Sequence, residues 1–233
     1  MLGHNRRMTG AQCLADMLDG YGVTHVFMVP AVLRRTLAEM ERRTAIKRIH
    51  AHGEKAAAYM ADGYARASGK PGICMAQVIG ALNLAAGLRD AWLAHSPVIA
   101  MTGGREPKTK FRKVYQEIDD MPAFEPVTKF NATIDDVARF PDMIRQAFRV
   151  AVSGCPGPVH LQFRGNEGQV DAEEAELEPL VEPLFTRVPP FRPEPDRESI
   201  RAALNLLQAA ERPVIVAGGG VRASGAEIGR AHV

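Results

Sequence analysis

One glutamate, Glu54, precedes a stretch of small residues and is the side chain best placed in this sequence for proton chemistry. Alanine occupies positions 56–58 and 61, so neighbouring backbones can pack closely there and exclude water. Burial raises the pKa of a carboxyl group because it disfavours the charged form, and such a group can transfer a proton near neutral pH. The alternative is an ordinary first-turn glutamate that the helix dipole stabilises, and composition alone favours that alternative.

The elements that must position Glu54 can be predicted from the hydrophobic pattern. Thr9 and Gln12 have the spacing of a capping box and predict a helix that ends near Gly20. Apolar strands that alternate with helices predict an α/β fold with a doubly wound, mostly parallel sheet. Further helices are expected at 33–42, 54–68, 81–94 and 135–152 (the last capped by Asp135), and strands at 23–29, 46–50, 73–78, 97–102, 126–134 and 158–163.

Several candidate residues follow directly after predicted strands. Glu54, Gly80 and the pair Gly103 and Gly104 each come just past the end of a strand. Ligands of parallel sheets bind outside the carboxyl ends of the strands. We therefore expect these residues to converge on one rim of the sheet.

The chain is predicted to contain one complete domain and the start of another. The first spans 1–165, and an acidic, proline-rich linker follows at 166–197. A helix at 199–210 and a buried strand at 213–217 then begin a second α/β domain over 198–233. The glycine-rich segment at 218–223 fits Gly-x-Gly-x-x-Ala, which is a weak dinucleotide-binding signal when it stands alone.

Five sequence elements, in order, resemble the N-terminal pyrimidine-binding (PYR) domain of thiamine diphosphate enzymes of the acetolactate synthase type. Glu54 stands eight residues before an Asp-Gly-Tyr-Ala-Arg element at 62–66. Gly-Ala-Leu-Asn-Leu at 80–84 is similar to the family's Gly-Pro-Gly-Ala-Thr-Asn turn, and 97–103 is similar to its next strand. Tyr-Gln-Glu-Ile-Asp at 115–119 resembles the Phe-Gln-Glu-x-Asp segment. The resemblance covers about residues 8–162.

This resemblance assigns roles to individual residues. It implies that Glu54 is catalytic and activates the cofactor by a hydrogen bond to N1′ of its aminopyrimidine ring. Pro30, Gly80 and Asn83 would line the pyrimidine together with Glu54, and Gln116 would face the substrate. The resemblance thus reverses the preference for a merely structural glutamate.

The chain departs from the family pattern at two turns. Ala31 stands where the family often has the last glycine of Gly-x-Pro-Gly. The turn at 78–83 has lost a glycine, the proline and the threonine of the family motif. Bulkier residues change how closely a backbone approaches a ligand, so the sequence indicates a divergent member.

The resemblance implies a thiamine diphosphate-dependent carboligase or decarboxylase of 2-keto acids, a transferase or lyase like acetolactate synthase. One alternative is a non-ligating decarboxylase that acts on a 2-keto, oxalyl or aryl substrate. An alternative of another class is a non-catalytic α/β module for dimerisation or nucleotide binding, in which Glu54 is dispensable.

Cofactors and partners follow from the same resemblance. The family holds Mg²⁺ and the diphosphate with a C-terminal Gly-Asp-Gly…Asn-Asn motif, which this sequence lacks. We therefore expect a fragment that is inactive alone, has no metal site of its own and works in a homodimer or homotetramer. FAD, bound by some members, is not expected here.

Composition excludes several other classes. A formal net charge of +2 gives no reason to expect nucleic acid or a membrane surface as a partner. No apolar stretch approaches the roughly 20 residues of a membrane span, and 1–7 lead into no apolar signal segment. Cys13, Cys74 and Cys155 match no metal or redox spacing and are predicted to be buried thiols, so the cytoplasm is expected.

Overall fold

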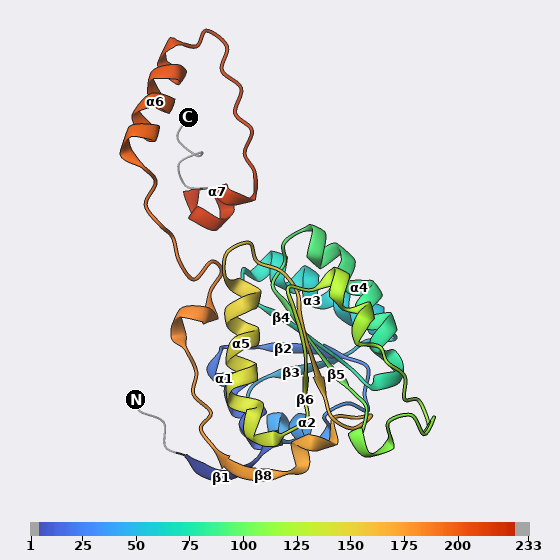
Figure 1. The fold of residues 1–233 in the computed structure, drawn as a ribbon. Coiled ribbons are helices and arrows are strands. Elements are labelled where there is room, and N and C mark those ends of the chain that lie inside the picture. The colour runs from blue at the N-terminus through green and yellow to red at the C-terminus, as the bar shows by residue number, and fades with distance from the viewer. Residues whose placement is uncertain (1–4, 227–233) are drawn as a thin grey trace. The chain divides into compact units, whose positions relative to one another are not determined.

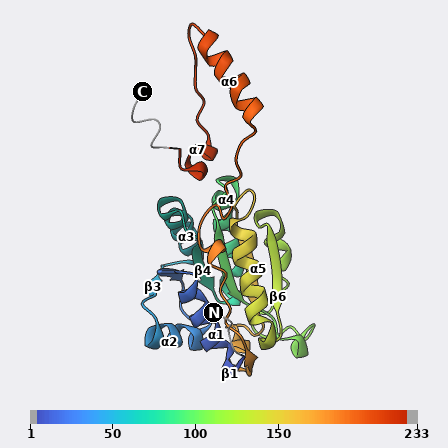
Figure 2. The same ribbon diagram turned by 90° about the vertical axis from the view of Figure 1, so that its left-hand side faces the viewer.

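The computed structural model describes residues 5–226, which form two units. The first unit, Met1–Pro190, is built on a sheet with helices on both faces (Figures 1 and 2). The second, Phe191–Val233, is much smaller and is described separately below.

Six parallel strands form the sheet, in the order β3-β2-β4-β5-β7-β6. Every residue of β4, β5 and β7 is buried, which explains why β4 and β5 read as mainly apolar runs. Strand β7 alternates apolar and polar residues, and its His160 and Gln162 are buried as well. The predicted fold class is therefore confirmed. The strands are β2 (His25–Met28), β3 (Lys47–His50), β4 (Gly72–Ala76), β5 (Val98–Gly103), β6 (Phe130–Ile134) and β7 (Val159–Phe163).

Each face of the sheet has its own helix layer. On one face lie α1 (Gly10–Gly20), α2 (Arg34–Arg43) and α5 (Phe140–Val152), which bury large side chains such as Leu14, Met40 and Phe148. On the other lie α3 (Glu54–Ser68) and α4 (Ala81–Leu93), whose buried residues are mostly alanine. The α3–α4 layer is thus close to the sheet, and it is the layer that begins with Glu54.

Two glycines allow this close packing. A Cβ atom at Gly87 of α4 would lie 2.7 Å from Cβ of Ala58 and 2.8 Å from the carbonyl oxygen of Lys55. A Cβ atom at Gly72 of β4 would lie 2.1 Å from the carbonyl oxygen of Ala61. Since real Cβ atoms do not approach so closely, helix α3 fits against α4 and the sheet only because both positions lack a side chain.

Of two predicted helix starts, the cap of α1 is confirmed and the cap of α5 is displaced by one residue. Thr9 and Gln12 form the expected capping box at the start of α1, with both hydrogen bonds at 3.2 Å. The cap before α5 is Asp136 rather than the predicted Asp135. Asp136 accepts a hydrogen bond of 2.9 Å from the backbone of Ala138, and one short turn separates it from the helix.

The acidic segment after β7 is not simply a linker, which corrects the sequence prediction for the first part of 166–197. Strand β8 (Glu174–Leu177) pairs antiparallel with β1 (Arg6–Thr9), an element that the sequence analysis missed. Asp171 is buried and accepts hydrogen bonds from the backbone and hydroxyl of Thr36 in the first turn of α2. Acidic composition suggested solvation, but this carboxylate caps a helix whose own N-cap residue provides no side-chain bond.

The second unit contains α6 (Arg197–Ala209) and the short α7 (Gly219–Ser224). The helix predicted at 199–210 is present, but the buried strand predicted at 213–217 is not. Val214, Ile215 and Val216 are exposed because the described residues of this unit contain no strand with which they could pair. Residues 227–233 of the predicted second domain lie outside the described residues, and the domain boundaries remain a prediction.

The structure also bears on the predicted absence of a membrane span and on the predicted burial of the cysteines. Among the described residues, no helix has the length and apolar character required to cross a bilayer. Cys13 and Cys74 are buried as predicted, and burial raises the pKa of the Cys13 thiol to about 12. Cys155 is exposed, so the prediction for that thiol is wrong; it lies in a turn between α5 and β7.

Candidate functional site

Glu54 is the first residue of α3, four positions after the end of β3. Gly53 before it has an extended backbone and offers no side chain to cap the helix. The carboxylate therefore lies where unsatisfied backbone N–H groups and the helix dipole favour a negative charge. The side chain is half-buried, less than the sequence analysis expected.

Two residues from the start of α4 contact the Glu54 side chain. Nδ2 of Asn83 donates a hydrogen bond of 3.3 Å to Oε2 of Glu54. A Cβ atom at Gly80 would lie 2.3 Å from Cγ and 2.5 Å from Oε1 of Glu54. The structure thus brings together three of the predicted site residues, Glu54, Gly80 and Asn83. Glycine is required at position 80 because the Glu54 side chain lies so close to it, and not because of its backbone angles.

The carboxylate is held by one oxygen only. Oε1 of Glu54 accepts no hydrogen bond from any residue between 5 and 226, whereas Oε2 is bonded by Asn83. A carboxyl group fixed in this way can exchange a proton, or a hydrogen bond, with a nitrogen heterocycle placed against Oε1. We refer to Glu54, Gly80 and Asn83 as the Glu54 cluster.

Pro30 follows the end of β2. It lines a groove of about 550 Å³ at the ends of β2 and β3, together with Ala31, Arg34 and His50 among others. None of the Glu54 cluster lines this groove, so the joint role of Pro30 and Glu54 stays a prediction. Ala31, at the position of the family glycine, has φ of +82°, a backbone conformation that glycine adopts more easily.

Gln116 occupies the long connection between β5 and β6. Its φ is +62°, and its Oε1 atom is buried with no hydrogen-bond partner in the described chain. A buried acceptor without a donor is costly, so such an atom marks a place where a ligand or water can supply the missing bond. No hydrogen bond joins Gln116 to the Glu54 cluster within residues 5–226.

Gly103 and Gly104 lie on the same rim of the parallel sheet as Glu54, as predicted, but their contacts are with the segment after β7. This segment crosses the carboxyl ends of the strands: the carbonyl of Asn166 accepts a 3.0 Å bond from Val78, and that of Gly165 a 2.8 Å bond from Gly104. A Cβ atom at Gly103 would lie 2.0 Å from the oxygen of Asn166. This segment therefore lies against the residues that follow β4 and β5 at the carboxyl edge of the sheet.

Sequence reasoning missed this crossing segment, although a signal was present. Gly165 and Gly168 follow directly after a buried strand, and both have a positive φ, +89° and +77°. Two closely spaced glycines after a strand indicate a tight reversal of the chain over the end of the sheet.

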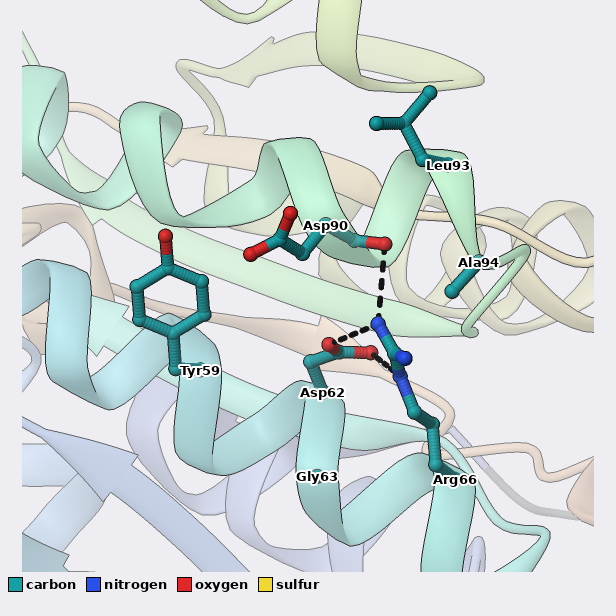
Figure 3. Close-up of a pocket in the computed structure, with 7 residues that line it drawn as sticks. All are labelled: Tyr59, Asp62, Gly63, Arg66, Asp90, Leu93 and Ala94. Atoms are coloured by element: carbon teal, nitrogen blue, oxygen red, sulfur yellow. Dashed lines mark hydrogen bonds and ion pairs between the residues drawn. The ribbon is translucent and has the colours of Figure 1, made fainter.

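The Asp-Gly-Tyr-Ala-Arg element binds α3 to α4 (Figure 3). Arg66 donates two hydrogen bonds to the Asp62 carboxylate, at 2.9 and 2.6 Å, and one of 3.2 Å to the backbone carbonyl of Asp90 in α4. These residues line a surface hollow of about 580 Å³ together with Tyr59 and Leu93. The motif therefore fixes the register of the two helices whose first turns carry the Glu54 cluster.

Comparison with known proteins gives the class to which this fold and site belong. Residues 8–123 match the family described as thiamine pyrophosphate enzyme, N-terminal TPP binding domain. The chain belongs to this family of thiamine diphosphate enzymes, as the sequence resemblance predicted.

Within the family, the chain is similar to acetolactate synthases. It is 36% identical over 224 residues to a probable acetolactate synthase large subunit of Methanocaldococcus jannaschii, covering 94% of this chain and 37% of that protein. It is 33% identical over 222 residues to the acetolactate synthase isozyme 1 large subunit of Escherichia coli (strain K12), covering 93% and 38%. A 2-hydroxyacyl-CoA lyase of Arabidopsis thaliana is 32% identical over 223 residues, covering 94% and 38%. The chain thus spans well under half the length of these relatives.

Proposed function

We propose that this chain provides the cofactor-activating half of a thiamine diphosphate-dependent enzyme that ligates or decarboxylates 2-keto acids, as acetolactate synthase does. The observation that carries the proposal is the Glu54 cluster. A helix-terminal carboxylate accepts a hydrogen bond from Asn83, lies against Gly80 and has no hydrogen-bond donor to Oε1 among residues 5–226.

The residues present fit the aminopyrimidine end of thiamine diphosphate. Glu54 would hydrogen-bond a ring nitrogen through Oε1, Asn83 would hold the carboxylate in place, and Gly80 would leave room for it. When bound, the cofactor supplies a nucleophilic carbon and an electron sink for cleaving carbon–carbon bonds. Pro30 would border the pyrimidine from the β2 side, and Gln116 would offer its unpartnered oxygen toward the substrate.

The diphosphate and Mg²⁺ would be held by residues outside this chain. Among residues 5–226, no group of three His, Cys, Asp or Glu side chains could hold a metal ion. FAD is not part of the proposal. A cytoplasmic location remains an expectation from the cysteine pattern.

We expect the chain to work as a homodimer or homotetramer, with the second copy covering the α3–α4 surface. Apolar side chains remain exposed along α3 and α4, including Tyr59, Leu82 and Leu93, the last 73% exposed. Exposed apolar patches of this kind mark interaction surfaces. Analytical ultracentrifugation should therefore show a dimer or larger, and replacing Leu82 and Leu93 by Ser should shift it toward monomer.

A second candidate is a lyase or decarboxylase that does not ligate. Its support is the similarity to the 2-hydroxyacyl-CoA lyase, whose name describes bond cleavage rather than ligation. Both candidates use the same glutamate, so the products distinguish them: a carboligase forms a longer 2-hydroxy acid, and a lyase forms an aldehyde.

The proposal is tested with the enzyme expressed from its native gene. A panel of 2-keto acids is offered with and without thiamine diphosphate and Mg²⁺, and CO₂ release and organic products are measured. We expect turnover that depends on thiamine diphosphate. A protein that neither binds the cofactor nor turns over any substrate would instead support a non-catalytic module.

A further inference from the structure

The connection between β5 and β6 presents a concentration of positive charge. Residues 107–116 contain four cations and no acid, whereas the whole chain has a formal net charge of only +2. Within the described residues these four form no ion pair, in contrast to Arg105, which lies 3.2 Å from Asp119. We call residues 105–119 the basic loop; its four cations without an acidic partner are Lys108, Lys110, Arg112 and Lys113. The ammonium of Lys110 lies 5.1 Å from the centroid of the Phe111 ring.

The basic loop is held at both ends by one buried residue of β7, Gln162. At the loop's start, a Cβ atom on Gly104 would lie 2.4 Å from Cγ of Gln162. At its end, the buried carboxylate of Asp120 accepts a 2.7 Å hydrogen bond from Nε2 of Gln162. Both loop ends are therefore fixed to the same side chain in the sheet.

A second anchor lies inside the loop. The Glu117 carboxylate accepts hydrogen bonds from the backbone N–H of Glu106, at 3.1 Å, and from the hydroxyl of Thr109, at 2.8 Å. This carboxylate is thereby occupied with the loop's own backbone and gives no ion pair to the cations of the tip. The acidic residue inside the loop therefore stabilises the loop's conformation and leaves the four cations without an acidic partner.

The tip also adopts an uncommon backbone conformation. Phe111, Lys113 and Gln116 have φ of +69°, +51° and +62°, although none is glycine. Each costs on the order of 1–2 kcal/mol for an L-amino acid. Such strain persists where the surrounding structure fixes it, and it gathers at ligand-binding segments.

The loop lies on the same edge of the sheet as the Glu54 cluster. It begins at the carboxyl end of β5, beside β4, whose carboxyl end leads to Gly80. Both ribbon views show the loop projecting from the end of the sheet (Figures 1 and 2). Gln116, with its buried and unpartnered Oε1, follows the cations directly along the chain.

We propose that the basic loop binds a second anionic group on the substrate, in addition to the carboxylate of a 2-keto acid. Cations without acidic partners repel one another, and a carboxylate or phosphate placed among them removes that repulsion. The substrate class is therefore one with a distal carboxylate or a phosphate. The inference rests on the proposed function, which supplies the 2-keto acid end of the substrate; the basic loop adds only the recognition of the distal group.

The experiment compares two variants of equal charge change in residues 1–233. Lys110→Gln/Lys113→Gln removes two charges from the loop, and Lys47→Gln/Lys70→Gln removes two exposed charges at the amino ends of β3 and β4, the opposite edge. Binding of pyruvate, 2-oxoglutarate and coenzyme A is measured by NMR titration at low and high salt. 2-Oxoglutarate tests a distal carboxylate, and coenzyme A tests a phosphate.

We expect either 2-oxoglutarate or coenzyme A to bind more tightly than pyruvate, and high salt to weaken that binding. The loop variant should weaken it about five- to tenfold, and the control variant should not. Equal binding of all three probes, or equal effects of both variants, would overturn the inference. Thiamine diphosphate-dependent turnover of the native enzyme, measured in parallel, shows separately whether the proposed function holds.

Discussion

The role proposed for Glu54 depends on how few groups bond to its carboxylate. One oxygen is bonded to Asn83, the other accepts no hydrogen bond from residues 5–226, and the side chain lies against Gly80, which has no side chain. The family resemblance predicted these three positions, but not that Pro30 would line a groove that excludes them or that Gln116 would lie in the long connection between β5 and β6. Spacing within one strand–helix unit is local, whereas the two outlying residues depend on long connections that no periodicity describes.

The floor of the site can be tested by Gly80→Ala. The added Cβ atom would overlap the Glu54 side chain at 2.3–2.5 Å, so the carboxylate must move away from Asn83. Because this side chain is flexible, we expect the fold to persist at a cost of about 1–3 kcal/mol, and turnover to fall about tenfold or more because orientation is lost. Steady-state kinetics and circular dichroism measure both.

The matched control is Gly220→Ala in α7, outside the α3–α4 surface. Nothing lies within 4 Å of a Cβ atom at that position, so alanine should leave turnover unchanged. Equal kinetics for Gly80→Ala and Gly220→Ala would mean that the absence of a side chain at Gly80 does not matter for the site.

At the scale of the elements, helices and central strands followed from the sequence because their patterns are local. The errors lie where distant segments meet. The acidic stretch after β7 was predicted to be a solvated linker, yet Asp171 is buried and caps α2. The apolar run 213–217 was predicted to be a strand, yet no partner strand exists for it among the described residues. Such outcomes depend on tertiary contacts.

The capping of α2 by Asp171, which comes from a distant part of the chain, can be tested by Asp171→Ala. The change removes two hydrogen bonds to Thr36 and leaves its backbone N–H unsatisfied, so the free energy of unfolding should fall by about 1–2 kcal/mol. Urea denaturation of residues 1–233 measures this. Asp171→Asn keeps an oxygen acceptor and should lose less; equal losses for Ala and Asn would argue against the capping role.

At the scale of the whole molecule, the sheet contains one fully buried histidine, His160. His160 is fully buried in β7, stacks on Phe124 with ring centroids 3.5 Å apart and bonds to Thr102 and Asn131. Burial lowers the pKa of His160 from 6.5 to about 3, because no charged partner compensates for lost solvation. The residue stabilises the fold only as neutral imidazole.

This histidine should make stability depend on pH. Below pH 6.5 the unfolded chain binds a proton at His160, and the folded chain does not until about pH 3. Its contribution is therefore fully present above pH 6.5 and is lost as pH falls, by up to about 1.4 kcal/mol per pH unit. Buried acids such as Asp171, whose pKa is raised by burial, act in the opposite direction.

The comparison that isolates this effect is His160→Gln. Urea denaturation between pH 4 and pH 6.5 should give a shallower pH dependence for the variant than for the wild-type chain, whatever its absolute stability. Parallel slopes for the two proteins would show that His160 is protonated, or exposed, in the folded state.

The central claim is that Glu54 activates thiamine diphosphate and is not merely a first-turn glutamate. The most direct test compares Glu54→Gln with Glu198→Gln, a glutamate in the first turn of α6 with no site around it, in the enzyme expressed from its native gene. Turnover of a 2-keto acid and retained thiamine diphosphate are measured together. We predict that Glu54→Gln lowers turnover about 100-fold or more while still retaining cofactor, and that Glu198→Gln changes neither. Unchanged turnover in Glu54→Gln would contradict the claim.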